Sequence, residues 1–244
     1  MRIVTWNVDK RLNLIGHLKD LQADVLLLQE FGPSKELQRG LLEQGLIHQF
    51  IPESQAVTDG HTCSAVFSRT EIEHIPTPSD FEMDHLLVAV KLGSIELVSL
   101  HIPNGSQYGG VVKQRHLLAA ARWISGRPNR LMAGDFNEPE LFRDGRALSW
   151  ASKDPAFDGW REAVSVLFND QNVRHLCKDL HTDEEPASWQ SKGRVSKVSR
   201  WYDHALWNGQ TLASKTSYLH DFNYTRKASD HSPLLIDLSH GLPT

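Results

Sequence analysis

Short apolar runs bounded by polar residues recur along the chain and predict β-strands. Each run is rich in aliphatic residues and has the length expected of a strand buried on one or both faces. The predicted strands cover residues 2–7, 24–29, 65–68, 86–92, 96–101, 130–133, 203–207 and 234–237.

Apolar residues at helical spacing predict helices between these strands. Leu12, Ile15, Leu18 and Leu21 fall on one face of a helix, and residues 111–125 repeat the pattern. A third helix is predicted over residues 160–167. Strands and helices alternate in the first half and hairpin-like pairs of strands follow, which indicates a mixed α/β chain instead of a purely parallel one.

Polar residues of a particular kind stand where the predicted strands end. The first strand ends at Asn7, the second at Glu30, and the strand over residues 96–101 at His101. The strand that begins at residue 130 is followed by Asp135 and Asn137. Because open α/β sheets bind ligands beyond the carboxyl ends of their strands, these side chains form a candidate site.

Composition adds limits to this picture. The chain has 244 residues, of which 40% are hydrophobic and 23% charged, so we expect one domain with a core of ordinary size. Two cysteines are too few for a disulfide framework, and no Cys-x-x-Cys metal motif occurs. No signal peptide or membrane span is evident, so a cytoplasmic location is expected.

The overall charge argues against an extended nucleic-acid-binding surface. The net charge is −4 and the pI is about 6.3, whereas proteins that grip nucleic acid over a broad surface are usually basic. A local basic patch or a smaller substrate would fit this charge. No obligate protein partner is evident from the sequence.

The candidate residues together suit phosphoester hydrolysis. Carboxylates bind Mg²⁺ through hard oxygen ligands, amides and imidazoles donate hydrogen bonds to phosphate, and a carboxylate or an Asp-supported His can activate water. The acids are Glu30, Asp135, Asp203 and Asp230, the amides Asn7, Asn104 and Asn137, and the imidazoles His101 and His231.

Six motifs in a fixed order resemble the endonuclease/exonuclease/phosphatase family. They are TWNVD (5–9), LLLQE (26–30), SLHIPNG (99–105), AGDFNEP (133–139), YDHALWN (202–208) and SDHSP (229–233). The resemblance spans residues 3 to 238 and implies a four-layer α/β sandwich, in which two packed mixed β-sheets are flanked by helices. It also implies Mg²⁺ or Mn²⁺ as the cofactor.

The resemblance assigns metal-side roles to four of these positions. Glu30 matches the principal metal-binding glutamate of the family, and Asn7 matches the amide beside the metal. Asp230 matches a metal-side aspartate. Asp9 matches a metal-proximal aspartate of the abasic-site branch, although Lys10 and Arg11 follow it and a surface ion pair would also explain it.

The remaining motif residues match catalytic positions. His101 matches a residue facing the phosphate, while Asp135 and Asn137 match the pair that orients the attacking water and binds phosphate. Asp203 matches the aspartate that supports the terminal histidine, which here is His231. Either Asp135 or His231 could serve as the general base.

The sequence gives mixed indications of the substrate. Abasic-site enzymes of the family generally carry Tyr where this chain has His101, which argues against that specificity. Trp189 and Asn104 are candidate substrate contacts, although Asn104 would be a turn residue by default. Basic residues interleaved with aromatics in and beside residues 191–200 suit a polynucleotide, although a solvated loop would look the same. The basic residues are Lys192, Arg194, Lys197 and Arg200.

The first hypothesis is therefore a metal-dependent nuclease that acts on DNA or RNA, with the choice between endonuclease and exonuclease action left open. The alternative enzyme is a phosphatase or phosphodiesterase for a small or lipid-derived phosphoester such as an inositol phosphate. A non-catalytic binding module is a third reading, which the complete set of acids and histidines argues against.

Overall fold

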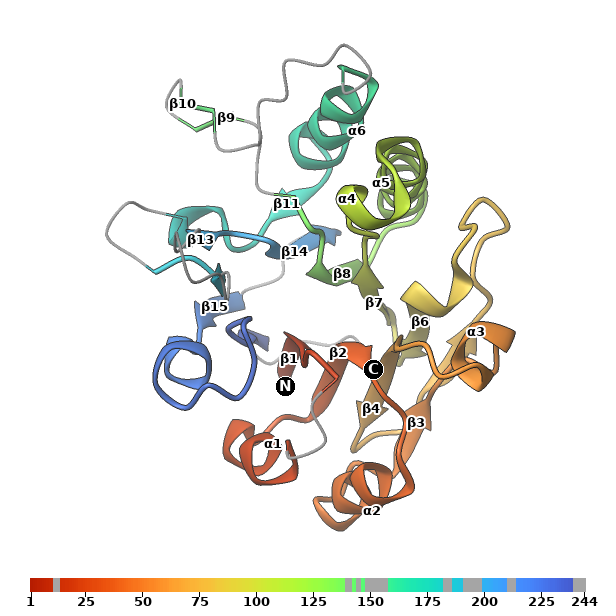
Figure 1. Ribbon diagram of the computed structural model, residues 1–244, viewed down its shortest axis with the longest axis vertical. Coiled ribbons are helices and arrows are strands. Elements are labelled where there is room, and N and C mark those ends of the chain that lie inside the picture. Colours follow the sequence, from red (N-terminus) through yellow and green to blue (C-terminus); the bar gives the residue numbers. More distant parts are fainter. Residues whose placement is uncertain are drawn as a thin grey trace.

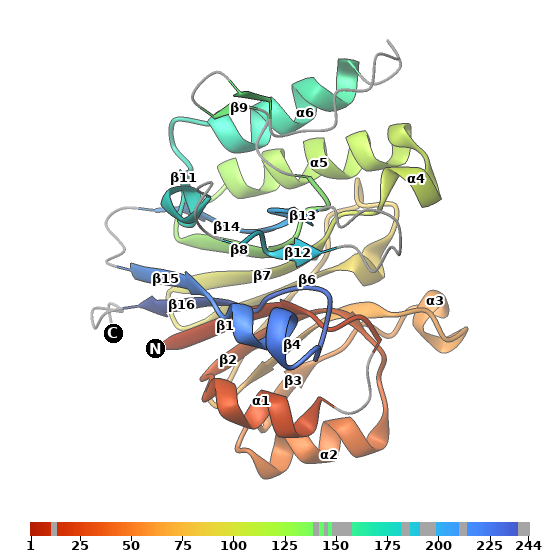
Figure 2. The same ribbon diagram turned by 60° about the vertical axis from the view of Figure 1, so that its left-hand side comes forward.

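Two six-stranded β-sheets pack face to face, and helices cover their outer faces (Figures 1 and 2). This arrangement is seen in a computed structural model, which describes residues 1–10, 14–138, 142–143, 146–147, 158–181, 186–190, 199–209 and 214–238. The four-layer α/β sandwich expected from the sequence is confirmed.

Each sheet combines one parallel pair of strands with antiparallel neighbours. In the first sheet β1 and β2 are parallel, and in the second β7 and β8 are parallel. The first sheet has the order β15 (Ser214–Tyr218), β16 (Leu234–Leu238), β1 (Arg2–Asn7), β2 (Val25–Phe31), β4 (Cys63–Ser68) and β3 (His48–Phe50). The second has the order β11 (Arg174–His175), β14 (Asp203–Asn208), β8 (Arg130–Asp135), β7 (Ile95–His101), β6 (Leu87–Leu92) and β5 (Glu73–Ile75).

Smaller elements connect and flank the two sheets. Two short hairpins pair β9 (Phe142–Arg143) with β10 (Arg146–Ala147) and β12 (Trp189–Gln190) with β13 (Ser199–Arg200). The helices are α1 (Ile15–Leu21), α2 (Lys35–Glu43), α3 (Gln55–Thr58), α4 (Gly105–Tyr108), α5 (Gly110–Ser125) and α6 (Asp158–Asn169). Single turns of tighter or wider helix are η1 (Asp84–Leu86), η3 (Lys178–Leu180) and η4 (Asp221–Thr225).

Alternation along the strands builds three apolar layers. On β2, Val25 and Leu27 face the second sheet, whereas Leu26 and Leu28 face the layer formed by α1 and α2. Successive side chains of a strand point to opposite faces, so a continuous apolar run fills both layers at once. On the far side, α5 and α6 pack together over the outer face of the second sheet.

A buried polar contact joins the two sheets next to the strand ends. The side-chain amide of Gln29 on β2 donates to the hydroxyl of Ser99 on β7 over 2.9 Å, and Ser99 donates to the carbonyl of Leu28 over 3.0 Å. Thr5 completes the group through its hydroxyl contact with Gln29. Since a buried polar group is costly unless it is paired, these bonds favour one alignment of the sheets.

The predicted strands are all present, and their bounds differ from the prediction by few residues. Strand β2 continues to Phe31, beyond Glu30, because a bulge between Leu28 and Phe31 keeps the strand paired with β4. Helix α2 was not predicted, although Leu37 and Leu41 on it are buried. Within the described residues, no helix is long and apolar enough to cross a membrane.

Candidate functional site

Strand register places three of the predicted site residues side by side. Asp135, at the end of β8, is the pairing partner of His101 on β7 and of Asp203 on β14. Gly134 allows this close approach, because a Cβ there would lie 1.9 Å from the carbonyl oxygen of Leu100. The register alone therefore sets His101, Asp135 and Asp203 in a row along one edge of the second sheet.

The first sheet contributes Asn7 and Glu30 to the same place. The Asn7 amide nitrogen donates to Asp135 Oδ2 over 2.9 Å and to Glu30 Oε1 over 3.1 Å, so it bridges carboxylates from the two sheets. Its oxygen accepts a hydrogen bond from the Asp9 backbone amide. Glu30 has φ 49°, a left-handed conformation that is uncommon outside glycine and that is seen here within the bulge of β2.

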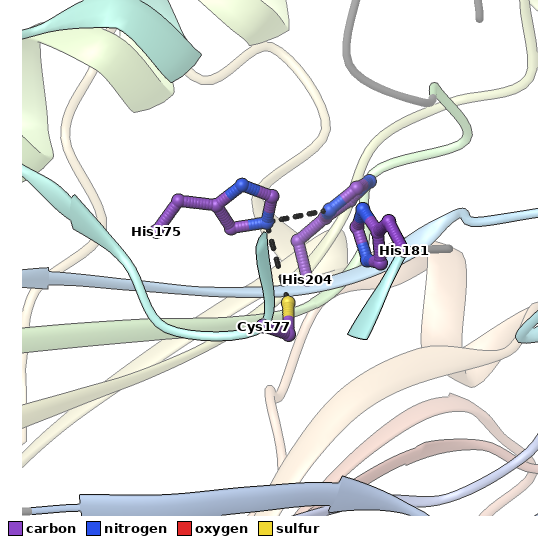
Figure 3. Close-up of side chains that lie close together, drawn as sticks. All are labelled: His175, Cys177, His181 and His204. Carbon is purple, nitrogen blue, oxygen red and sulfur yellow. Dashed lines mark hydrogen bonds between the residues drawn. The ribbon is translucent and has the colours of Figure 1, made fainter. Parts of the chain in front are cut away.

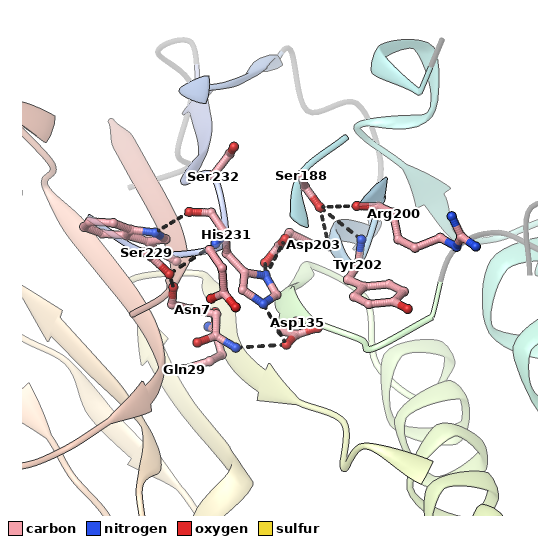
Figure 4. A network of polar contacts seen from close by, with 12 residues as sticks. Asn7, Gln29, Asp135, Ser188, Arg200, Tyr202, Asp203, Ser229, His231 and Ser232 are labelled. Carbon is pink, nitrogen blue, oxygen red and sulfur yellow. Dashed lines mark hydrogen bonds and ion pairs between the residues drawn. The ribbon is translucent and has the colours of Figure 1, made fainter. Parts of the chain in front are cut away.

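His231 lies between two carboxylates of the second sheet (Figure 4). Its Nδ1 is 2.9 and 3.1 Å from the two carboxylate oxygens of Asp203, and its Nε2 is 3.7 Å from Asp135 Oδ2. Burial lowers the pKa of the imidazole, but Asp203 and Asp135 outweigh this and raise the pKa to about 10. His231 is therefore an imidazolium near neutral pH and can donate a hydrogen bond from Nε2.

Backbone contacts fix the segment that carries His231. The Trp6 indole donates to the His231 carbonyl over 3.0 Å. The Ser229 hydroxyl donates to the Asn7 carbonyl over 2.7 Å and accepts from the His231 amide over 3.1 Å. These bonds tie the loop before β16 to the end of β1, so the histidine is placed by the first sheet while its partner Asp203 belongs to the second.

Asn137 organises the loop that follows β8. Its backbone amide donates to Asp135 Oδ1 over 2.7 Å, and its side-chain amide donates to the Ile102 carbonyl over 2.9 Å. The same amide lies 3.2 Å from His101 Nε2. Burial raises the pKa of Asp135, while the nearby His231 and His101 act in the opposite direction. The buried Asp135 carboxylate thus accepts hydrogen bonds from the Asn7 side chain and from both the backbone and the side chain of Asn137.

A cleft of about 720 Å³ is lined by Glu30, His101, Asp135, Asn137 and His231. Asn7 and Asp203 contact these residues but do not line the cleft. Of the other predicted residues, Asp9, Asn104, Trp189 and Asp230 also line the cleft. Asn104 caps α4 by accepting hydrogen bonds from Ser106, as its default reading as a turn residue anticipated. The Asp230 carbonyl accepts hydrogen bonds from Asn223 and Gln190.

Of the predicted basic residues, Arg200 is the one that the structure describes. The Arg200 side chain points away from the Asp203–His231 pair, and Arg200 is not among the residues that line the cleft (Figure 4). Lys192, Arg194 and Lys197 lie outside the described residues.

Sequence reasoning missed part of the cleft wall. Tyr202 stacks on Trp189, with ring centroids 5.1 Å apart and planes 28° from parallel. His61, His85 and Tyr108 also line the cleft. Tyr202 is the first residue of the YDHALWN motif, but the sequence analysis assigned it no role of its own. The two histidines stand in segments without a motif, and only the fold brings them to the cleft.

The donor set suits a hard divalent cation. Glu30, His101 and Asp135 each offer one donor atom, and these three atoms lie within 4.8 Å of one another. The other acidic residues on the cleft wall, Asp9 and Asp230, again offer carboxylate oxygens. Oxygen-rich sites of this kind favour Mg²⁺ or Mn²⁺ over metals that prefer sulfur.

Known proteins resemble this chain in sequence profile and in fold. Residues 4–231 match the profile of the Endonuclease/Exonuclease/phosphatase family. No curated protein sequence matches the chain significantly. The fold is similar to that of a 3′ phosphatase, NExo, from Neisseria bound to a product DNA hairpin, with a TM-score of 0.78 and 16% identity over 98% of this chain and 100% of that one.

Two further structures have the same fold. An AP endonuclease from Archaeoglobus fulgidus superposes with a TM-score of 0.77 and 18% identity, over 98% of this chain and 100% of that chain. A 3′-5′ exonuclease, NExo, from Neisseria meningitidis gives a TM-score of 0.76 and 16% identity over the same shares of the two chains. At these identities the likeness concerns the fold.

Proposed function

The chain belongs to the endonuclease/exonuclease/phosphatase family, and on that premise we propose that its cleft hydrolyses phosphodiesters of DNA, or of RNA, with the help of Mg²⁺ or Mn²⁺. The observation that carries the proposal is the position of His231. The imidazolium lies between Asp203 and Asp135 and faces the same cleft as Glu30 and Asp230. A cationic donor beside a cluster of carboxylates suits an anionic substrate that arrives with a divalent cation.

Glu30 would hold the cation, with Asp230 and Asp9 close by on the cleft wall. When bound, the cation neutralises charge on the phosphate oxygens and the leaving group. Asn7 turns its amide nitrogen toward Glu30 and Asp135 and its oxygen toward the Asp9 amide. In this arrangement Asn7 orients the carboxylates that surround the cation.

Asp135 and His231 would have different roles at the phosphate, as general base and as hydrogen-bond donor. His231 is already protonated near neutral pH, so it donates from Nε2 to a phosphate oxygen and is a poor proton acceptor. Asp135 is the buried carboxylate in the row and is more basic than an ordinary aspartate. Asp135 therefore orients the attacking water and takes its proton, while Asn137 holds the Asp135 carboxylate in place.

The aromatic pair at the rim supports a nucleic-acid substrate. Trp189 and Tyr202 form a stacked surface on the cleft wall, and base stacking on aromatic side chains contributes about 1–3 kcal/mol per base. A protein of the same fold has been seen with a DNA hairpin. These observations favour DNA as the first substrate to test.

One observation favours a second candidate, a phosphatase or phosphodiesterase for a small phosphoester such as an inositol phosphate. Among the described residues that line the cleft, Lys10 is the single lysine or arginine. Together with the net charge of −4, this gives little attraction for a long polyanion. A compact substrate would need fewer basic contacts.

The test is an activity panel with the purified chain in Mg²⁺, Mn²⁺ or EDTA. The substrates are duplex, single-stranded and abasic DNA, RNA, inositol phosphates and an aryl phosphodiester. We expect hydrolysis with either metal and none in EDTA, with the fold retained because the core does not depend on this cation. Activity that survives EDTA would refute the proposed chemistry, whereas turnover of inositol phosphates alone would favour the second candidate.

Two variants test the division of roles. Glu30→Gln should raise the Mg²⁺ concentration needed for half-maximal activity, because it removes a charged ligand. Asp135→Asn should lower turnover about 10²–10³-fold with little change in the Mg²⁺ requirement. Glu36→Gln, on the exposed face of α2, is the matched control. Near-normal rates in both site variants would place the chemistry elsewhere.

A basic-segment variant separates the two substrate classes. If Lys192, Arg194 and Lys197 track a polynucleotide backbone, neutralising all three should raise KM for DNA. It should also flatten the salt dependence by about one unit of slope for each lost phosphate contact. Hydrolysis of the aryl phosphodiester should hardly change. An equal loss on both substrates would contradict a backbone-tracking role.

A further inference from the structure

Three histidines and a cysteine, none of which lines the cleft, converge around β11 and β14 (Figure 3). They are His175 on β11, Cys177 in the turn that follows it, His181 after η3 and His204 on β14. One donor atom from each side chain lies within 4.8 Å of those of the other three. Cys177, His181 and His204 are buried, and His175 is half-buried.

The spacing of the donors is close to that of a tetrahedral metal site. His175 Nε2 lies 3.0 Å from His204 Nδ1 and 3.2 Å from the Cys177 sulfur. Zinc bonds of about 2.0–2.1 Å to nitrogen and 2.3 Å to sulfur place tetrahedral ligands about 3.3–3.6 Å apart. Small side-chain movements would therefore admit an ion at the centre of the group.

The outward nitrogens of two of the rings are held by the protein. His204 Nε2 lies 2.7 Å from the Glu138 carbonyl oxygen, and His181 Nε2 lies 2.9 Å from the Tyr218 hydroxyl oxygen. A hydrogen bond at one ring nitrogen leaves the other for a metal, which is the usual arrangement around metal-bound histidines. Both contacts thus fix the ring orientation that a metal site needs.

We propose that His175, Cys177, His181 and His204 form a structural zinc site distinct from the cation site of the cleft. Four protein ligands close the coordination sphere, so no position is left for a substrate. A thiolate with three imidazoles favours Zn²⁺ and disfavours Mg²⁺, which prefers oxygen ligands. The group contains no carboxylate, in contrast to the cleft.

The position of the site indicates what the ion would stabilise. It joins β11 and the turn at Cys177 to β14, whose first residue is Asp203. The Tyr218 hydroxyl that contacts His181 also donates to the Asp203 carbonyl over 2.6 Å, and the Glu138 carbonyl that contacts His204 directly follows Asn137. The zinc site would therefore help to position Asp203 and the backbone next to Asn137.

The experiment measures metal content in untagged full-length protein purified without added zinc. We expect close to one zinc ion per chain, retained in excess Mg²⁺ and in the Glu30→Gln variant. Cys177→Ser and His204→Gln should each lose most of it. Cys63→Ser and His116→Gln remove a buried cysteine and a buried histidine outside the group, and these controls should keep the zinc.

Cobalt provides a readout that does not depend on the variants folding. When Co²⁺ replaces the ion in the wild-type chain, a thiolate-to-cobalt charge-transfer band and the absorption of tetrahedral Co²⁺ should appear. Removing the ion should also lower Tm, because a structural metal contributes to folding. The proposal is overturned if the wild-type chain binds neither zinc nor cobalt stoichiometrically, or if Cys177→Ser retains the wild-type zinc content.

Discussion

Both carboxylate oxygens of Asp203 lie within 3.1 Å of Nδ1 of His231, although Asp203 begins β14 of the second sheet and His231 lies in the loop before β16 of the first. The contact fixes the imidazole in one orientation, with Nε2 directed toward Asp135. A carboxylate so placed also stabilises the charged ring. The pair is therefore expected to act as one unit in the reaction.

His231→Ala should lower kcat about 10²–10³-fold, the loss expected when a preorganised donor to an oxyanion is removed. Asp203→Ala should cost less, because the imidazole remains but is poorly held. The double variant should be little worse than His231→Ala, since residues that act as a unit are not additive. The rates are normalised to folded protein, with His48→Ala on the edge strand β3 as the control. Additive losses would contradict the pairing.

The free energy of unfolding should fall between about pH 6.5 and pH 10 because of His231. Burial lowers the pKa of the ring, but Asp203 and Asp135 raise it to about 10. Below pH 6.5 the ring is charged in both the folded and the unfolded chain, so the stabilisation is complete. As the pH rises, the unfolded chain loses the proton first, and the stabilisation disappears as the pH passes the folded pKa. Urea unfolding in EDTA measures this profile.

Asp203→Asn provides the comparison for that profile. It removes the strongest of the interactions that raise the pKa of His231, so its stability should vary less over the same pH range. The difference between the two profiles cancels the titration of other groups. If the free energies of unfolding of the wild type and of Asp203→Asn change in parallel with pH, the pKa of His231 is not raised by Asp203.

Gly134→Ala should destabilise the chain by several kcal/mol or prevent folding. Its Cβ would meet the Leu100 carbonyl at 1.9 Å, in backbone that cannot move without separating β7 from β8. Gly16→Ala on α1 is the control, because no atom lies within 4 Å of the new Cβ. There the substitution should raise stability by up to about 1 kcal/mol. Equal thermal stability of the two variants would argue against the close approach of the strands.

Lys113 and Glu138 form a buried ion pair beneath the Asn137 loop, and Lys113 also donates to the Asn137 carbonyl over 2.8 Å. Lys113→Met should cost about 3–5 kcal/mol at pH 8, because it leaves a buried carboxylate unpaired. Burial already raises the pKa of Glu138 to about 7, so the loss should shrink near pH 5, where Glu138 can be protonated.

Two further variants complete this test. The double variant Lys113→Met/Glu138→Leu should be more stable than Lys113→Met at pH 8, since no buried charge remains. Arg115→Met removes one partner of an exposed ion pair and should change stability little. Chemical denaturation measures the free energy of unfolding of the wild type and of the three variants. A double variant less stable than the single one would contradict the expected coupling.

The central strands could be predicted because each fills two apolar layers and ends in a polar residue. Asn7, Glu30, His101 and Asp135 follow from that pattern, and the pairing of β7 with β8 explains why two of them meet. Strand β15 was missed because its sequence, Ser214–Tyr218, has few apolar residues and lies at a sheet edge. An edge strand is stabilised by pairing with its neighbour, which its own sequence does not reveal.

The group around Cys177 shows a second reason why a site can escape prediction from the sequence. His175, Cys177 and His181 are close together in the sequence, but three donors alone do not indicate a tetrahedral metal site, which needs a fourth. That donor, His204, comes from β14 and reaches the group because β11 pairs with β14. A site made by pairing between distant strands is hidden until the topology is known.

The cleft has one half on each sheet, with Asn7 and Glu30 on the first and His101, Asp135 and Asp203 on the second. A chain with only one sheet formed would therefore have one half of the site and lack the other. A substrate or cation that contacts residues of both sheets binds only when the two sheets are packed together. By mass action such a ligand stabilises the docked form, so occupancy of the cleft and cohesion of the sandwich are thermodynamically linked.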